Sequence, residues 1–275
     1  MKKILVPVDF SKYSENAFLS ALKISEKLGA QLTLVNVVNT LLEWDKLSTN
    51  EKTKHRDIID QEVEAKDKLD AFVQRHNIGK VPVDIVVAVG VPYEEILSLA
   101  QKIAAELIII GAYGRGTEGE KFIGSNIQKV MRKAECPVLA VKHAIDGNSW
   151  RKMAITTSLN SQLDGNLDKL IPLFNGFQPS LHLLYVNTPE HFMPSKKTET
   201  LLEELASKFH GFTVHQHIYN HPEVENGIVE FCKSRNIGWI TIVSDHKGEN
   251  SSYQIGVTDT VLFKTALPIL SIHTS

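Results

Sequence analysis

The chain has 275 residues, of which 43% are hydrophobic and 23% charged, with a formal net charge of −2 at pH 7. This balance is that of a globular protein of about two domains, and it excludes disordered, collagen-like and coiled-coil chains. Without a basic excess, without an apolar run near the ~20 residues of a membrane span, and with only two cysteines, we expect a cytoplasmic protein that binds neither nucleic acid nor membrane and contains no disulfide framework.

Strands and helices alternate along the first half. A strand over residues 4–8 leads into a helix that ends at Leu28, with Ser11 as its N-cap and Gly29 as its stop. Such alternation with apolar strands predicts a parallel sheet covered by helices on both faces. The remaining expected elements are a strand over 32–38, a long charged helix over 51–76, a strand over 83–88, a helix over 92–104, a strand over 107–110, a helix over 125–133 and a strand over 137–141.

The sequence pattern of the first half recurs in the second half. Residues 3–9 align with 152–158 at an offset of 149, and the same offset carries 32–37 onto 181–186. Later segments stay in order with an offset of about 130: 91–92 with 221–222, 107–110 with 240–243, and 137–141 with 268–272. A repeat of this length indicates two copies of one fold. We expect a first domain over 1–146 and a second over 147–275, joined within the turn-forming segment 143–150.

A glycine-rich segment follows the fourth strand. Gly111, Gly114 and Gly124 would let the backbone approach a ligand, and Gly124-Ser125 opens a helix whose N–H groups favour an anion. Ligands of open parallel sheets collect at the carboxyl ends of the strands, where this segment lies. The segment lacks the Gly-Lys-Ser/Thr of a Walker loop. It therefore predicts a phosphate cradle, with a plain surface loop as the alternative interpretation.

The spacing Gly111-x2-Gly114-x9-Gly124-Ser125, together with Asp9 after the first strand and Val37 on the second, resembles the ATP-binding branch of the universal stress protein family in its tandem form. The resemblance implies an α/β fold of two tandem five-stranded parallel-sheet sandwiches, Rossmann-like and similar to the adenine nucleotide alpha hydrolases. It also implies that the two final edge strands pair antiparallel and make a pseudo-dimer from one chain. Association of two chains as a homodimer is left open.

The resemblance further implies a set of nucleotide-binding residues. The adenine would lie near Asp9 and the backbone at Val37, and the ribose and phosphates would contact the glycine segment. Arg115 could reach a phosphate, or it is a solvated loop arginine; Asp9 is alternatively a turn or helix-entry acid. The expected ATP site, with Mg or Mn accompanying the phosphates, comprises Pro7, Val8, Asp9, Val37, Gly111, Gly114, Arg115, Gly124, Ser125 and Asn126.

The second half departs from this pattern. Ser158 replaces Asp9, and in the aligned loop Ser244, Lys247 and Val257 stand where the first half has Gly111, Gly114 and Ser125. Side chains here would occupy the space that phosphates need. We expect the second domain to be a degenerate copy without a nucleotide.

Other candidate residues give weaker indications of function. His215 and His217 share one face of a strand and could chelate a metal, but no nearby cysteine completes a zinc set, so we expect exposed strand histidines and no metal site. No nucleophile–base arrangement is visible, so we expect no catalytic residues and at most slow ATP hydrolysis. The sequence favours an ATP-binding stress-response or regulatory protein with an unidentified protein partner. A nucleotide-free interaction scaffold and a nucleotidyl-transfer enzyme are the alternatives.

Overall fold

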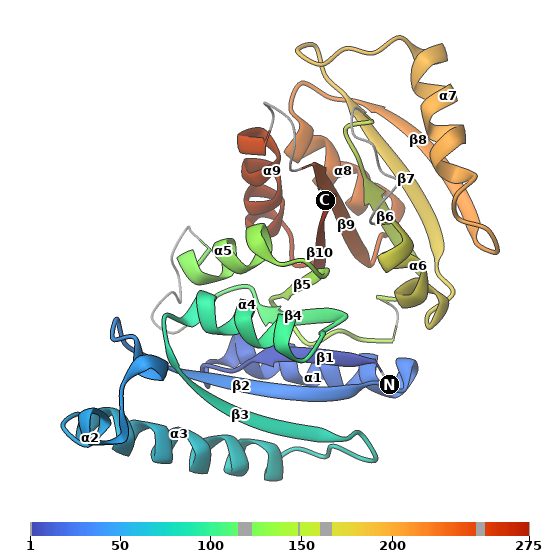
Figure 1. The fold of residues 1–275 in the computed structure, drawn as a ribbon. Helices are drawn as coiled ribbons and strands as arrows, with labels where there is room; N and C mark the ends of the chain where they lie inside the picture. The colour runs from blue at the N-terminus through green and yellow to red at the C-terminus, as the bar shows by residue number, and fades with distance from the viewer. Residues whose placement is uncertain (1, 115–122, 148, 160–166, 246–250, 275) are drawn as a thin grey trace.

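The computed structural model describes residues 2–114, 123–147, 149–159, 167–245 and 251–274 (Figure 1). The first half contains β1 (Lys3–Pro7), α1 (Lys12–Leu28), β2 (Gln31–Asn39), the 3₁₀ helix η1 (Trp44–Lys46), α2 (Thr49–Lys52), α3 (Arg56–Gln74), β3 (Val83–Gly90), α4 (Pro92–Lys102), β4 (Leu107–Gly111), α5 (Ser125–Lys133) and β5 (Val138–Val141). The second half contains β6 (Lys152–Thr156), α6 (Leu167–Asn175), β7 (Ser180–Asn187), α7 (Ser195–Ala206), β8 (Thr213–Asn220), α8 (Val224–Arg235), β9 (Trp239–Asp245), α9 (Ser251–Lys264) and β10 (Ile269–Thr274).

One continuous ten-stranded sheet runs through both halves, in the order β3-β2-β1-β4-β5-β10-β9-β6-β7-β8. Neighbouring strands are parallel within each half, whereas β5 and β10 pair antiparallel at the centre, with Leu139 opposite Leu270. Each half therefore has the five-stranded α/β topology that the sequence predicts. The expected pairing of the two final strands within one chain is confirmed.

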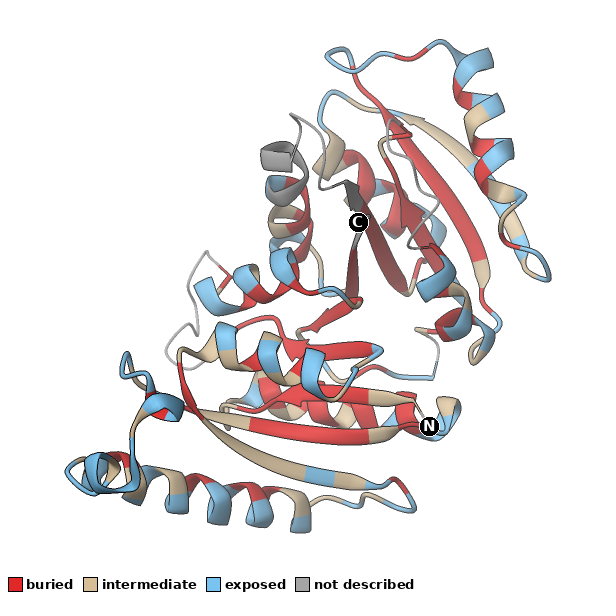
Figure 2. Ribbon diagram, in the orientation of Figure 1, coloured by how far each residue is buried: buried red, intermediate tan, exposed pale blue. Residues whose placement is uncertain are grey.

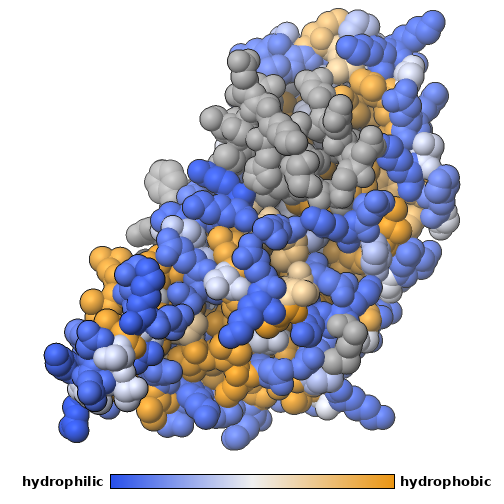
Figure 3. All heavy atoms as spheres, in the orientation of Figure 1, coloured by the Kyte–Doolittle hydropathy of each residue, from blue (hydrophilic) through white to orange (hydrophobic). Residues whose placement is uncertain are grey.

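Helices cover both faces of this sheet (Figure 2). Buried side chains of α1, α3, α6 and α7 pack on one face, where Phe18 and Phe72 meet Ile4 and Leu32. Buried side chains of α4, α5, α8 and α9 pack on the other face. Figure 3 shows hydrophilic side chains over most of the surface on one side, with hydrophobic ones gathered mainly over the first half. No helix within the described ranges is both long enough and apolar enough to cross a membrane.

The ends of α1 are set by local chemistry, as the sequence predicts. The Ser11 side chain accepts a hydrogen bond from the Ser14 amide, and Gly29 ends the helix in the left-handed conformation with φ 61°. Glycine adopts this conformation without the steric cost that a Cβ brings. Both predictions are confirmed.

The predicted helix over 51–76 is found as α3, but it begins only at Arg56, because the chain breaks between α2 and α3. Ser48 and Glu51 form a reciprocal capping box that starts the short α2, and α3 restarts only after His55. The break lets Trp44, which is 6% exposed, pack with Ile58 in a small cluster against the ends of β2 and β3. A charge pattern of helical period does not show this tertiary contact.

The backbone itself repeats between the halves. Residues with a left-handed backbone conformation (positive φ) occur at equivalent turns of the two halves, although most of these residues are not glycine. The matched pairs, with their φ angles, are Phe10 (63°) with Leu159 (57°), Gly29 (61°) with Gln178 (49°), and Ala104 (51°) with Asn236 (50°). Non-glycine residues rarely adopt this conformation. Its occurrence at equivalent positions therefore supports the view that the two halves are copies of one backbone fold.

The sheet register corrects two alignments of the repeat. Ile108 lies opposite Val138, and Ile240 lies opposite Ile269, so Gly111 corresponds to Val243 rather than to Ser244. The predicted match of 107–110 with 240–243 is therefore shifted by one residue. The match of Pro92 with Pro222 also fails. Pro92 is the first residue of α4, whereas Pro222 lies before Glu223, the N-cap of α8, so the two prolines are not equivalent. Short apolar runs of similar composition align equally well in neighbouring registers.

Candidate functional site

The carboxyl ends of β1, β2 and β4 lie at one edge of the first half. The Val8 amide donates to the Val35 carbonyl at 2.8 Å, and Asn36 Nδ2 donates to the Val8 carbonyl at 2.7 Å. These bonds hold the end of β1 against β2. Pro7 and Val8 are buried, so they position this edge, whereas Val37 is half-buried on β2.

Asp9 lies at the centre of this edge. Its Oδ1 accepts a hydrogen bond from the Ser11 amide at 3.0 Å, directly before α1. Its Oδ2 faces the glycine segment, since a Cβ built on Gly114 would lie 3.3 Å from it. The fold thus brings together two of the predicted site residues. The Ser11 bond also gives Asp9 the helix-entry role that the sequence left as the alternative.

Gly111 has a structural reason to be glycine. A Cβ there would lie 2.6 Å from the Tyr13 carbonyl carbon and 2.9 Å from the Ser14 amide nitrogen. The first turn of α1 therefore packs directly on the end of β4. This close approach is by itself a sufficient reason for the glycine.

Aromatic and basic side chains that the sequence did not single out lie beside these residues. The Tyr113 ring is 5.0 Å from the Tyr13 ring, and the Lys142 ammonium lies 5.3 Å from the Tyr113 ring centroid. Lys142 also donates to the Phe263 carbonyl of the second half at 2.9 Å, and burial lowers its pKa. In the sequence, the position of Tyr113 between Gly111 and Gly114 could have indicated that this tyrosine lies at the candidate site.

The start of α5 has the features of an anion site. Gly124 is the N-cap and supplies no side-chain hydrogen bond, and the first turn contains no acidic residue. Ser125 and Asn126 are exposed. A Cβ on Gly124 would meet only Ile127 Cδ1, at an ordinary 3.5 Å, so no described protein atom requires glycine here. The first N–H groups of an uncapped helix attract an anion. Arg115 lies outside the described residues.

The second half builds the same edge differently. The Thr157 amide donates to the Leu184 carbonyl at 3.3 Å, as Val8 does to Val35, so Ser158 does take the place of Asp9. However, α9 begins at Ser251, and Val257 is buried inside that helix rather than at its start. The helix N-terminus that α5 offers at Ser125 has no counterpart at Val257. Lys247 lies outside the described residues.

The predicted strand histidines form part of a stack. His182 on β7 lies opposite His215 on β8, and its Nδ1 is 3.0 Å from His217 Nε2. The three rings are stacked or tilted against one another, and His182 is 7% exposed. Across the described ranges, no group of three or more His, Cys, Asp or Glu is placed to hold a metal ion.

This stack predicts a stability loss in acid. Burial, followed by repulsion from His217, lowers the pKa of His182 from 6.5 to about 4. The unfolded chain therefore takes up a proton at higher pH than the folded chain does, and the native state loses free energy as pH falls from 6.5 toward 4. Urea unfolding should show up to about 3 kcal/mol less stability at pH 4 from this group, and His182→Phe should remove that part of the pH dependence. An unchanged pH dependence in the variant would show that His182 does not titrate in this way.

The fold defines a class of protein: a tandem of two five-stranded α/β units joined through their final strands. The family model of the universal stress proteins matches residues 1–142, and the chain belongs to that family. A universal stress protein of Methanocaldococcus jannaschii is 29% identical over 51% of this chain and 94% of its own length, and one of Thermus aquaticus is 31% identical over 51% and 98%. A crystal structure of a universal stress protein from Archaeoglobus fulgidus covers 99% of this chain and 98% of its own, with a TM-score of 0.74 and 16% identity. This last likeness supports the tandem fold over both halves.

Proposed function

We propose that the chain is a stress-response or regulatory protein that binds ATP in its first half. One observation carries this proposal: Asp9, Gly114 and the uncapped start of α5 are placed at the carboxyl edge of a parallel sheet, where such folds bind ligands. Membership of the universal stress protein family supports it, because the glycine spacing is that of the family's ATP-binding branch.

Each residue has a role that its chemistry fits. The Asp9 carboxylate accepts a hydrogen bond from the adenine amino group or a ribose hydroxyl, and Val37 lies against the flat base. Ser125 and the Asn126 amide donate to phosphate oxygens at the start of α5, and Gly124 leaves room for them. Mg or Mn would be held mainly by phosphate oxygens, as is usual for Mg bound with nucleotides. The remaining proposed site residues are Pro7, Val8, Gly111, Gly114 and Arg115.

The second domain would then respond to nucleotide binding in the first domain. Gln128 on α5 donates through Nε2 to Asp259 Oδ2 on α9 at 2.9 Å, and burial raises the pKa of Asp259. A nucleotide that binds the start of α5 therefore acts on a helix in direct contact with the second half. We assign the nucleotide to residues 1–146 and a structural or regulatory role to residues 147–275.

Calorimetric titration of the full chain with ATP and magnesium tests the proposal. We expect saturation at one nucleotide per chain, because the second half has Ser158 and the interior of α9 where the first has Asp9 and a helix start. Heat extraction of the freshly purified protein followed by chromatography gives an independent readout. Two bound nucleotides would place a working site in the second half, and no binding would favour the nucleotide-free scaffold.

A further inference from the structure

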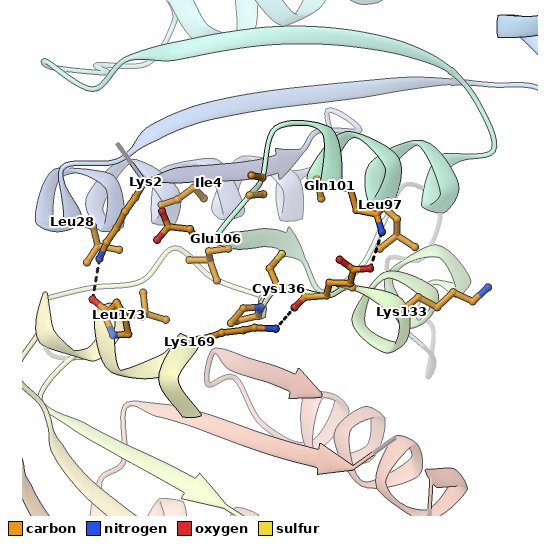
Figure 4. A pocket seen from close by; sticks show the side chains of 18 residues that line it. Lys2, Ile4, Leu28, Leu97, Gln101, Glu106, Lys133, Cys136, Lys169 and Leu173 are labelled. Atoms are coloured by element: carbon orange, nitrogen blue, oxygen red, sulfur yellow. Dashed lines mark hydrogen bonds between the residues drawn. The ribbon is translucent and has the colours of Figure 1, made fainter. Parts of the chain in front are cut away.

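A cavity with a volume of about 560 Å³ lies between the two halves. It opens at the amino ends of β1 and β4, and so at the opposite edge of the sheet from the proposed nucleotide site. Its walls come from the first half at the starts of these strands and the end of α4, and from α6 of the second half (Figure 4). Sites for small molecules typically have volumes of ~300–1,000 Å³. This cavity is large enough for one.

The interior of the cavity is mostly apolar. Two of its aliphatic residues, Ile4 and Leu107, are 1% and 2% exposed and belong to the sheet core. Such walls favour a ligand with an apolar body, because its transfer out of water is favourable. The principal apolar lining residues are Ile4, Leu28, Leu97, Leu107, Pro137 and Leu173.

Two lysines, one from each half, line the solvent-exposed rim of this cavity. Lys2 Nζ donates to the Pro172 carbonyl at 3.0 Å, and Lys169 Nζ donates to the Glu135 carbonyl at 2.9 Å. Neither lysine forms a salt bridge with a described residue. Since an ammonium has three donors, each keeps capacity for an anion.

Among the described residues, the lining also contains the carboxylates of Glu106 and Glu135, and neither forms a salt bridge with Lys2 or Lys169. Glu135 accepts a hydrogen bond from Gln101 Nε2 at 2.9 Å, and Glu106 is exposed. The positive charge of Lys169 acts on the neighbouring Cys136, whose pKa burial nonetheless raises to about 11. Lys169 and Cys136 both line the cavity.

We propose that this cavity binds a small amphipathic carboxylate, of the medium-chain fatty acid class. Its carboxylate accepts a hydrogen bond from Lys169 at the rim, and its alkyl body packs on the apolar wall. Because α6 supplies one wall and the first half supplies the other, the bound molecule holds the two halves together. This site is separate from the nucleotide site and does not depend on it.

Titration of the full chain with sodium decanoate, 1-decanol and decyltrimethylammonium tests the ligand class. We expect decanoate to bind one per chain and more tightly than either comparator. Lys169→Gln should weaken decanoate about 10-fold or more, since a hydrogen bond to a charged group is lost, and leave decanol unchanged. Lys152→Gln is the matched control, because Lys152 also donates to a carbonyl, that of Arg235 at 3.2 Å, but does not line the cavity.

Alkylation of the two cysteines by iodoacetamide at pH 9 locates the site in the unaltered chain. Cys136 lines the cavity and Cys232 does not, so decanoate should slow the modification of Cys136 alone. Equal modification of Cys136 with and without decanoate would overturn the assignment of the cavity. Failure of decanoate to bind, or equal affinity for the cationic comparator, would overturn the ligand class.

Discussion

Replacing Gly114 by lysine is expected to lower the affinity for ATP by at least about 100-fold, or about 2.7 kcal/mol, while the fold stays intact. A Cβ at this position would already lie 3.3 Å from Asp9 Oδ2, and the longer chain would occupy the space between Asp9 and the start of α5. The added positive charge favours a phosphate, but it cannot compensate for the lost space. Calorimetric titration with ATP measures the change, and circular dichroism verifies the fold.

Gly147→Lys is the matched control for this substitution. A Cβ on Gly147 would meet no described atom within 4 Å, and the residue lies in the segment that joins the two halves. The same chemical change there should leave the affinity for ATP unaltered. Equal affinities of the Gly114→Lys variant and the unaltered chain would mean that the glycine segment does not hold the phosphates.

Gly111→Ala is expected to destabilise the whole first half, by about 1–3 kcal/mol, as overpacking of a close contact does. The new methyl group would lie 2.6 Å from the Tyr13 carbonyl carbon, and this neighbour is backbone that cannot rotate away. Either α1 or the end of β4 must move. Thermal unfolding should show a fall in Tm of roughly 2–10 °C.

Gly256→Ala provides the contrast. Gly256 lies in α9 and is exposed, and a Cβ added there would meet no described atom within 4 Å. Alanine in a helix interior is favoured over glycine by roughly 0.5–1 kcal/mol, so this variant should keep or gain stability. If Gly111→Ala were as stable as Gly256→Ala, the packing of α1 on β4 would not be the reason for the glycine at 111.

Features set by neighbouring residues could be predicted. Ser11 and Gly29 bound α1 as expected, and α5 spans Ser125–Lys133 as its pattern indicates. The repeat at an offset of 149 is also visible, since β1 and β6 begin at Lys3 and Lys152. These features follow from hydrogen-bonding caps and from apolar periodicity, which residues a few positions apart determine.

Features that depend on distant packing could not be predicted. The register of β9 was displaced by one residue, because successive apolar residues in a buried strand look alike in either register. The break between α2 and α3 accompanies the packing of Trp44 with Ile58, a contact that the local charge pattern does not show.

The sequence by itself determined that this protein is a tandem repeat of an α/β unit and that only the first half has the Gly-x2-Gly-x9-Gly-Ser spacing. Its resemblance to the universal stress proteins implied that the two halves meet at their final strands. The tertiary structure alone decided that Gly111 serves the packing of α1, that Asp9 faces Gly114, and that Lys2 and Lys169, from different halves, line one cavity. The physical reason is sequence separation. Caps and periodicity act within a few residues, whereas these contacts join segments about a hundred residues or more apart and exist only once the strand order brings them together.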